Sequence, residues 1–258
     1  MLKGGDLMAA GAVEANVTTN TGKIGAYFDG VDDKIDLSAI PEIDKDKPFS
    51  VALDYYKTND DPVLIFTSVK GGTNRFAITA QTGIAGGIYN GAAYRAASTT
   101  GDPANRKWYN IVYTYNGANT ANSDSQLYID GVLQTGTGTP APNATAGVRI
   151  GMDTGGGKIY KGTIGNMKVW SRLLSPTEAI TASTGAPVQG MIHHWKLATD
   201  YKDSVGSNDG TNDGTHFAII DDAIEAAIKA DRTTANDTYL LAKGGRGQIV
   251  SAVIEENP

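Results

Sequence analysis

The sequence predicts an all-β fold, an antiparallel β-sandwich or jelly roll that carries a short helix and hairpin as a C-terminal extension. Short apolar runs recur between about residue 24 and residue 175, and turn-forming residues separate them. Glycine alone contributes 32 of the 258 residues. The best-defined run, WYNIVYTY at 108–115, is aromatic or β-branched at nearly every position. Many short strands with regularly spaced turns are typical of sandwiches and jelly rolls.

Clear turn signals bound most of the predicted strands. The run 24–28 ends in an Asp-Gly turn, and the run 126–129 ends in a second Asp-Gly turn, which is the strongest hairpin signal in the chain. Residues 49–56 alternate in polarity at several positions, as a strand with one buried face does. The other predicted strands are 35–37, 63–68, 76–79, 87–89, 94–97, 132–133, 148–151 and 162–170.

A helix is predicted directly after the last of these strands. Ser175 is a capping residue, Pro176 occupies the first helical position, and Glu178 follows the cap by three residues. This combination predicts one or two helical turns that end near residue 182.

The remaining residues change in character. A short strand with an aromatic centre is predicted at 191–197, and residues 202–215 are rich in Asp, Asn, Ser and Gly, which predicts a loop. Two aspartates then precede an Ala- and Ile-rich helix at 223–230. Residues 239–242 and 248–254 are predicted to pair as a final hairpin.

Composition argues against several classes of function. The chain has no cysteine, so it can form neither a disulfide nor a thiolate metal site. The net charge is -6 and the basic residues are scattered, which argues against nucleic acid as a partner. No apolar stretch approaches the roughly 20 residues of a membrane helix. Residues 1–10 lack the pattern of a secretory signal.

Four phrases of the sequence occur in the order of a known domain family. Residues 22–38 (GKIGAYFDGVDDKIDLS) resemble its entry strand, and residues 106–117 (RKWYNIVYTYNG) its tryptophan-bearing central strand. LYIDGVLQ at 127–134 resembles its Asp-Gly hairpin, and residues 159–179 resemble its last strand and following helix. Together they resemble laminin-G-like domains of phage type, which belong to the concanavalin A-like lectin and glucanase jelly rolls. The resemblance implies a concanavalin A-like sandwich over 22–182.

A fifth phrase of that family is out of order. HHWKLATDYKDSVGSNDGTNDGT at 193–215 resembles the family's opening strand and first loop, yet it follows the last strand. It could begin a second copy, but only about 40 residues remain after it. Circular permutation is the favoured interpretation, because the first and last strands of this fold are expected to be neighbours. In a variant, the displaced strand inserts into a neighbouring subunit and makes the protein an obligate oligomer.

These observations predict two parts of the chain. Residues 1–216 form the jelly roll, with 191–215 as its displaced first strand and loop. Residues 217–258 form a helix and hairpin that serve in docking or assembly, because elements this short bury little core of their own.

No catalytic constellation is visible, so the sequence predicts a protein that binds or assembles and is not an enzyme. Hydrolases on related sandwiches use a pair of carboxylates on one sheet. The runs 108–115 and 162–170 contain no acid, and Asp54 is the single acid of its strand. Further acids sit beside a turn and are interpreted as solvated turn residues; they are Asp32, Asp33 and Asp36.

Calcium is the cofactor to consider. It binds carboxylate, amide and carbonyl oxygens at flexible spacing, and laminin-G-like domains often hold it, so the resemblance supports a site here. The candidate ligands are Asp203, Ser207, Asn208 and Asp209 in the loop, with Asp29 from the adjoining turn. The same residue types also form turns without any ion, so both interpretations remain open.

Three tyrosines are candidate glycan contacts. Tyr89, Tyr94 and Tyr160 lie near predicted loops, where an exposed ring could stack on a sugar face. The alternative is that they are ordinary half-buried strand residues.

The function expected from these patterns is that of a bacteriophage virion surface protein, of the capsid decoration or head-fibre type. A cell-surface type of domain without cysteine or secretory signal suits a particle released by lysis. Its expected partners are capsid or fibre subunits, further copies of itself and cell-surface glycan. The alternative is a carbohydrate-binding module of a tail fibre or a bacterial surface protein, located outside the cell.

Overall fold

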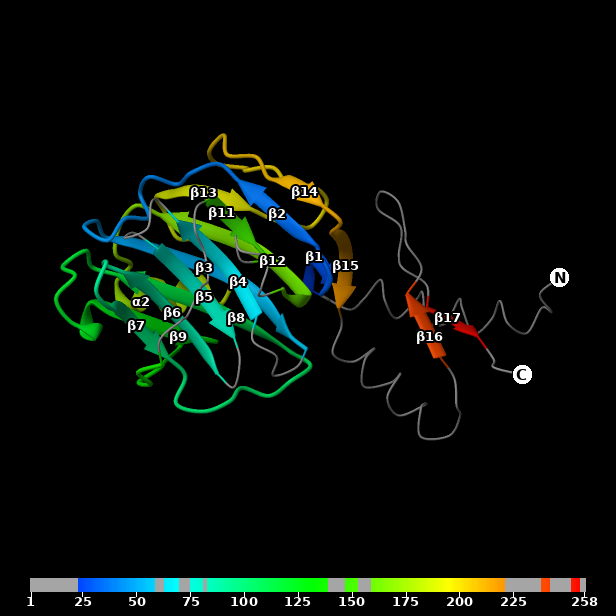
Figure 1. Ribbon diagram of the computed structural model, residues 1–258, viewed down its shortest axis with the longest axis horizontal. Coiled ribbons are helices and arrows are strands. Elements are labelled where there is room, and N and C mark those ends of the chain that lie inside the picture. Colours follow the sequence, from blue (N-terminus) through cyan, green and yellow to red (C-terminus); the bar gives the residue numbers. More distant parts are fainter. Residues whose placement is uncertain are drawn as a thin grey trace. The chain divides into compact units, whose positions relative to one another are not determined.

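The computed structural model describes residues 23–58, 63–69, 75–80, 83–138, 147–152, 159–220, 238–241 and 252–255 (Figure 1). The chain divides into two compact units. Gly25–Ala218 is one unit, and Met1–Ile24 together with Ile219–Pro258 is the other. In the part of the chain that is described, no helix is both long and apolar enough to cross a membrane.

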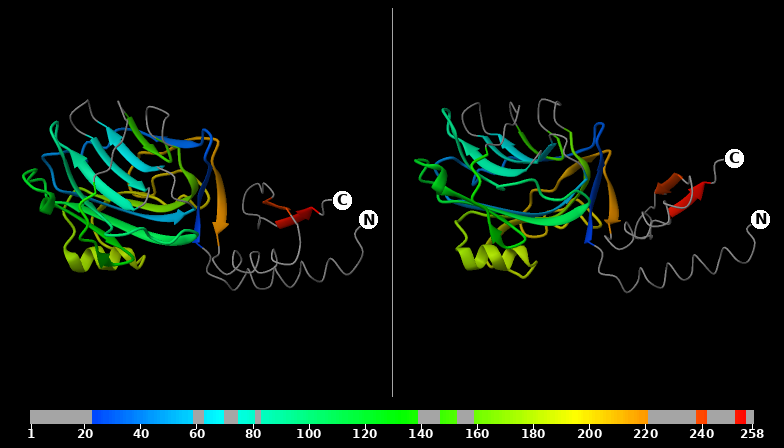
Figure 2. Two further views of the ribbon diagram at one scale, coloured as in Figure 1. Left: turned by 60° about the horizontal axis from the view of Figure 1, so that its bottom comes forward. Right: turned by 90° about the horizontal axis from the view of Figure 1, so that it is seen from below.

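Two antiparallel sheets stack face to face in the larger unit, which confirms the predicted all-β sandwich (Figure 2). Sheet A contains β1 (Lys23–Asp29), β3 (Phe49–Lys57), β8 (Lys107–Tyr115), β9 (Ser125–Ile129), β10 (Val132–Leu133), β12 (Lys161–Trp170), β13 (Met191–Trp195) and β15 (His216–Ile220). Sheet B contains β2 (Lys34–Leu37), β4 (Val63–Val69), β5 (Arg75–Ala80), β6 (Ile84–Tyr89), β7 (Tyr94–Ser98), β11 (Gly147–Ile150) and β14 (Thr211–Asp213).

The strand order shows how distant segments meet. Sheet A runs β10-β9-β8-β3-β12-β1-β15, with β13 also paired to β12. Sheet B runs β14-β2-β11-β4-β5-β6-β7. A short 3-10 turn, η1 (Asn122–Asp124), precedes β9.

The core between the sheets follows from strand alternation. In β3 and β8, every second residue faces sheet B and is buried, as the period of two requires. These residues are Phe49, Val51, Leu53, Tyr55, Tyr109, Ile111, Tyr113 and Tyr115. The alternation that predicted β3 from the sequence is therefore the alternation that builds the core.

One helix, α2 (Pro176–Ser183), covers part of the outer face of sheet A (Figure 2, yellow-green). Its start is the predicted capping box: Glu178 N donates to Ser175 Oγ, and Ser175 N donates to Glu178 Oε2. Ala179 and Ala182 pack on apolar residues of the sheet, among them Trp170.

The strand β13 pairs with β12, the last long strand of sheet A. One edge of β12 pairs with β3, and the other edge is shared by two strands. β1 pairs with residues 161–164 of β12, and β13 pairs with residues 167–170. Between them, Asn166 has a left-handed backbone (φ 50°), and its N–H donates to Lys196 O at 3.0 Å. β13 pairs here within its own chain.

The region predicted as a loop before residue 216 contains strand β14, and β15 follows it. β14 adds to the edge of sheet B beside β2, with Thr211 opposite Asp36 and Asp213 opposite Lys34. The side chains of β14 are exposed, so no apolar alternation marked it as a strand. Further on, β16 (Thr238–Leu241) pairs with β17 (Ala252–Glu255) as a hairpin. The helix predicted at 223–230 lies outside the described residues.

We predict that the core depends on β13. Trp195 is fully buried and its Nε1–H donates to Asn208 O at 2.6 Å, so Trp195→Ala should lower the free energy of unfolding by about 3–5 kcal/mol. Denaturant unfolding of the two chains measures this difference. Leu173→Ala is the control: Leu173 is 42% exposed, and its loss should change stability by less than about 0.5 kcal/mol. Equal effects of the two substitutions would contradict the placement of β13 in the core.

Candidate functional site

Asp203 organises the loop that follows β13. Its side chain is completely buried and accepts hydrogen bonds at both oxygens. Oδ1 accepts the backbone N–H groups of His194 (2.9 Å), Val205 (3.2 Å) and Gly206 (3.0 Å). Oδ2 accepts the Asn208 N–H (3.2 Å) and lies 2.5 Å from His193 Nδ1. The carboxylate thus binds its own loop.

The other predicted loop ligands are hydrogen-bonded within the protein or exposed on its surface. Asn208 Oδ1 accepts from Ser38 N at 2.8 Å, and Asn208 Nδ2 donates to Ser38 O at 3.0 Å. Asp209 Oδ1 accepts from Asp203 N at 2.9 Å, and Ser207 is exposed. Asp203 and Asn208 thus form a hydrogen-bonded clasp that ties the loop to β2 and β13, and calcium binding by these residues stays a prediction.

Burial and hydrogen bonding shift the pKa of Asp203 in opposite directions. Burial alone would raise its pKa, since it penalises the charged form. The hydrogen bonds from His194 N, His193 and Gly206 N outweigh burial and lower the pKa to about 2. The carboxylate is therefore charged over the whole physiological range.

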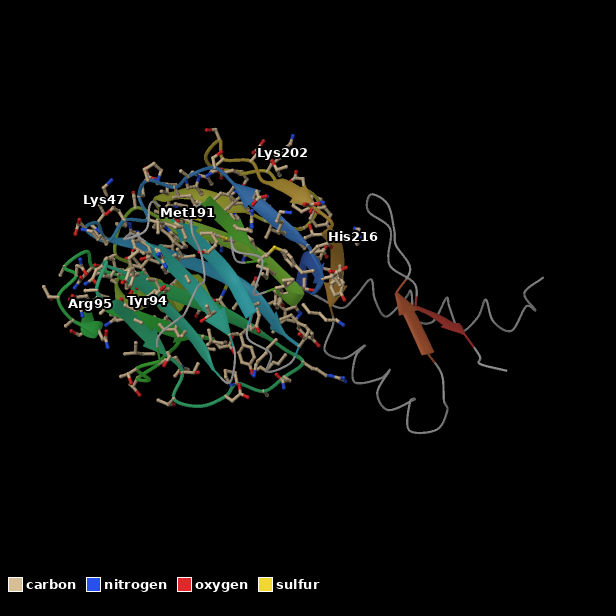
Figure 3. All side chains as sticks on the ribbon, viewed as in Figure 1. Lys47, Tyr94, Arg95, Met191, Lys202 and His216 are labelled. Atoms are coloured by element: carbon tan, nitrogen blue, oxygen red, sulfur yellow. The ribbon has the colours of Figure 1, made fainter. Side chains whose placement is uncertain are left out.

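Asp29 is the last residue of β1 and clusters with two other acids. One carboxylate oxygen from each of Asp29, Asp32 and Asp33 lies within 4.8 Å of the others. Asp33 is buried, and burial together with the charge of Asp29 raises its pKa, although an N–H donated by Asp29 works against this. His216, labelled in Figure 3 on β15, also lowers the Asp33 pKa by its charge. Carboxylate oxygens are among the ligands that calcium prefers.

Two of the three predicted glycan contacts come together on the outer face of sheet B. Ile88 faces the core, so its neighbour Tyr89 faces outward, and Tyr89 pairs in register with Tyr94 across the β6–β7 hairpin. Their ring centroids are 5.1 Å apart. Arg75, on the adjacent strand β5, pairs with Tyr89 in register and places its guanidinium 5.6 Å from the Tyr89 ring centroid. Figure 3 labels Tyr94 at this end of the sandwich.

The three side chains form a half-buried surface cluster, here called the Arg75–tyrosine cluster. Burial raises the pKa of Tyr94 to about 12, against the opposing charge of Arg75, so its hydroxyl stays protonated. Tyr89 Oη donates to Gly91 O at 2.9 Å, which holds its ring. Arg75 Nε is buried and makes no hydrogen bond. The sequence pointed to the tyrosines, but no local signal identified Arg75, because the pairing of β5 with β6 is not visible in the pattern.

Tyr160, the third predicted glycan contact, is a core residue. Its side chain is 1% exposed, and its ring packs near Phe28 and Tyr55. Its hydroxyl donates toward Tyr56 O at 2.6 Å and Thr163 O at 3.0 Å. No sugar reaches a ring in this position, so the prediction for Tyr160 is wrong. The residue follows a loop in sequence yet points inward at the start of β12.

Comparisons with known proteins agree with this architecture. The family model for laminin-G domains of the concanavalin A-like lectin/glucanases superfamily matches residues 17–179. A Bacteroides ovatus protein assigned to carbohydrate binding is 18% identical with a TM-score of 0.58, over 78% of this chain and 60% of that one. The heptameric SAP-like pentraxin of Limulus polyphemus is 14% identical with a TM-score of 0.51, over 78% and 97%. A search of curated proteins found no match.

We predict that Asp203 stabilises the fold in a pH-dependent way. Its folded pKa of about 2 lies below the ordinary value of 3.8, so its contribution is present above pH 4 and is lost as the pH falls toward 2. The wild-type chain should lose about 2 kcal/mol more than Asp203→Asn between pH 5 and pH 2 in denaturant unfolding. Asp200→Asn, an exposed position nearby, should follow the wild type. Parallel pH curves for all three chains would refute the role of this carboxylate.

Proposed function

Because the chain belongs to the concanavalin A-like lectin/glucanases superfamily, we propose that it is a non-catalytic carbohydrate-binding domain. The observation that carries this proposal is the Arg75–tyrosine cluster on sheet B. Its two rings lie 5.1 Å apart, and its arginine has no ion pair among the described residues.

The cluster has the chemistry that sugar binding requires. A tyrosine ring offers an apolar face to the C–H groups of a sugar and loses little conformational freedom on binding. The Arg75 guanidinium offers N–H donors to hydroxyl oxygens. Rigid strands β5, β6 and β7 hold all three side chains, so little ordering is needed when a ligand binds.

The partners of two acids on the described sheet faces, Asp36 and Asp54, support binding over hydrolysis. Among the described strands of sheet B, the outward-facing acid Asp36 pairs with Arg149, whose Nε donates to Asp36 Oδ1 at 2.6 Å. On sheet A, Asp54 accepts from the side-chain amides of Asn110 and Asn166. Each of these two acids is therefore held by a side chain of a neighbouring strand.

Calcium is a second element of the proposal. We place it at Asp29, Asp32 and Asp33, where a cation would offset the mutual repulsion of three carboxylates. The ion would brace the turn between β1 and β2.

Display on a particle is a further part of the proposal. A bacteriophage virion surface, or alternatively a bacterial surface or tail fibre, suits a binding domain joined to a separate short unit. In that unit, the β16–β17 hairpin has four-residue strands, and a two-stranded hairpin of this size is marginally stable alone. Docking on a capsid, a fibre or another copy of the chain would stabilise it. A density map of a native particle would locate the domain, and its absence from every particle surface would refute this part.

We predict that glycan binding requires the Arg75–tyrosine cluster. On a glycan array, the full chain should bind at least one saccharide class, and Tyr94→Ala and Arg75→Leu should each weaken that binding by about tenfold. Tyr27→Ala is the matched control, because Tyr27 is a partly exposed tyrosine on β1 of the other sheet. No binding by the wild type, or hydrolysis of the bound glycan, would overturn the proposed function.

We predict that calcium raises the thermal midpoint of unfolding through Asp29, Asp32 and Asp33. Asp29→Asn should abolish the calcium-induced shift, because it removes one of three charged ligands. Asp209→Asn should retain the shift, since its remaining oxygen can still accept from Asp203 N. Scanning calorimetry with calcium and with chelator makes the comparison. Loss of the shift in Asp209→Asn alone would return the site to the 203–209 loop.

A further inference from the structure

The outer face of sheet B carries an excess of positive charge on its described strands. Strand alternation and cross-strand register place five charged side chains on this face. They are Lys34, Asp36, Arg75, Arg149 and Asp213. Arg95 of β7 pairs with the core-facing Ile88 and therefore points to the other side of the sheet. The face thus has three basic residues and two acidic ones, although the whole chain has a net charge of -6.

Both acids on this face are neutralised by ion pairs. Arg149 Nε donates to Asp36 Oδ1 at 2.6 Å, and Lys34 Nζ pairs with Asp213 Oδ2. The positive charge left over is that of Arg75, in the Arg75–tyrosine cluster. The connections that join its strands add no acid, because residues 70–74 read KGGTN and residues 90–93 read NGAA.

The Arg75 guanidinium is positioned by a ring and not by an anion. Its central carbon lies 5.6 Å from the Tyr89 ring centroid, and it makes no ion pair with any residue that the structure describes. A guanidinium stacked on a ring keeps its N–H donors directed outward in its own plane. Arg75 is also half-buried, so it has lost part of its hydration without gaining an ionic partner. A ligand that carries a negative charge would supply that partner.

We infer that the Arg75–tyrosine cluster takes an acidic saccharide, with a carboxylate or sulfate group on Arg75 and an apolar sugar face on the Tyr94 ring. The inference rests on the proposed function and names the class of glycan. A carboxylate or sulfate accepts two parallel N–H bonds from one guanidinium, and such bonds are about twice as strong as those to a neutral acceptor.

The order of the three side chains suits a ligand with a charged end and an apolar face. Arg75 lies opposite Tyr89 in the register of β5 and β6, and Tyr89 lies opposite Tyr94 in the register of β6 and β7. Neighbouring strands are about 4.8 Å apart, so this row is about 10 Å long. The guanidinium is at one end of the row and the Tyr94 ring is at the other.

Two simpler ligands satisfy only part of the cluster. A neutral saccharide would cover the rings and leave Arg75 without a counterion, and a free inorganic anion would pair with Arg75 and leave the rings uncovered. Tyr94 does not compete for the guanidinium as an anion, because burial raises its pKa to about 12 and its hydroxyl stays protonated.

The test is a glycan array of matched pairs, probed with the full chain in the presence of chelator so that calcium plays no part. Each pair is one saccharide with and without a single acidic group. The pairs are glucuronate-terminated and glucose-terminated chains, lactose with and without a terminal sialic acid, and N-acetyllactosamine with and without a sulfate ester. We expect at least one acidic member to bind about tenfold more tightly than its neutral partner. Raising the salt from about 0.05 M to about 0.5 M should reduce this preference, because ions screen a half-exposed charge.

Three variants assign the preference to Arg75. Arg75→Gln should remove it, so that acidic and neutral members bind alike. Arg75→Lys should keep part of it, because the charge remains while the two-bond geometry is lost. Lys34→Gln is the matched control: it removes one positive charge from the same face, outside the cluster, and should keep the full preference. Thermal unfolding of each variant checks that it is folded.

The outcomes separate this inference from the proposed function. Equal binding of acidic and neutral members, weakened by Tyr94→Ala, would overturn the acidic ligand and leave carbohydrate binding in place. An acidic preference that survives in folded Arg75→Gln would overturn the role of Arg75. Binding of inorganic sulfate with no saccharide bound, or no binding at all, would overturn both the inference and the proposed function.

Discussion

The shared edge of β12 is the constraint on which the rest of this structure depends. A sandwich of this kind needs a continuous sheet beside its last long strand, yet β1 pairs only with residues 161–164. β13 covers residues 167–170, and Trp195 and Leu197 close the core there. The Asp203 clasp then holds the chain after β13 through two backbone segments, and Asn208 ties it to the end of β2. The pairing of β13 with β12, the burial of Trp195 and the hydrogen bonds of Asp203 therefore depend on one another.

Much of the fold could be predicted from the sequence, because its strongest strands follow simple periodicity. The alternation of β3, the aromatic run of β8 and the Ser175–Glu178 capping box each use one local rule. β14 escaped prediction, because an edge strand whose side chains are all exposed needs only backbone pairing. The position of β13 could be inferred only from the order of family-like phrases, since its own composition says nothing about which strand it joins.

The candidate sites were less accessible to prediction, for reasons that differ by residue. Tyr89 and Tyr94 flank a short hairpin, so their proximity is a local property. Arg75 joins them through the β5–β6 register, which depends on a turn and on core packing. The role of Asp203 could not be decided from the sequence, because a carboxylate accepts N–H donors with the same lone pairs that bind calcium. The N–H donors around Asp203 become visible only in the folded loop.

A single physical trend connects these outcomes. In this chain, Asp203 and Asn208, which resemble ligands in the sequence, hydrogen-bond the backbone around them. A loop without cysteine or much apolar side-chain surface must be held by such hydrogen bonds, because it can bury little else. Strands already satisfy their own backbone groups, so their outward side chains can keep unmet hydrogen-bonding capacity, as Arg75 and Asn110 do. Recognition in this domain is therefore expected on the sheet faces, and the loops mainly hold those faces in register.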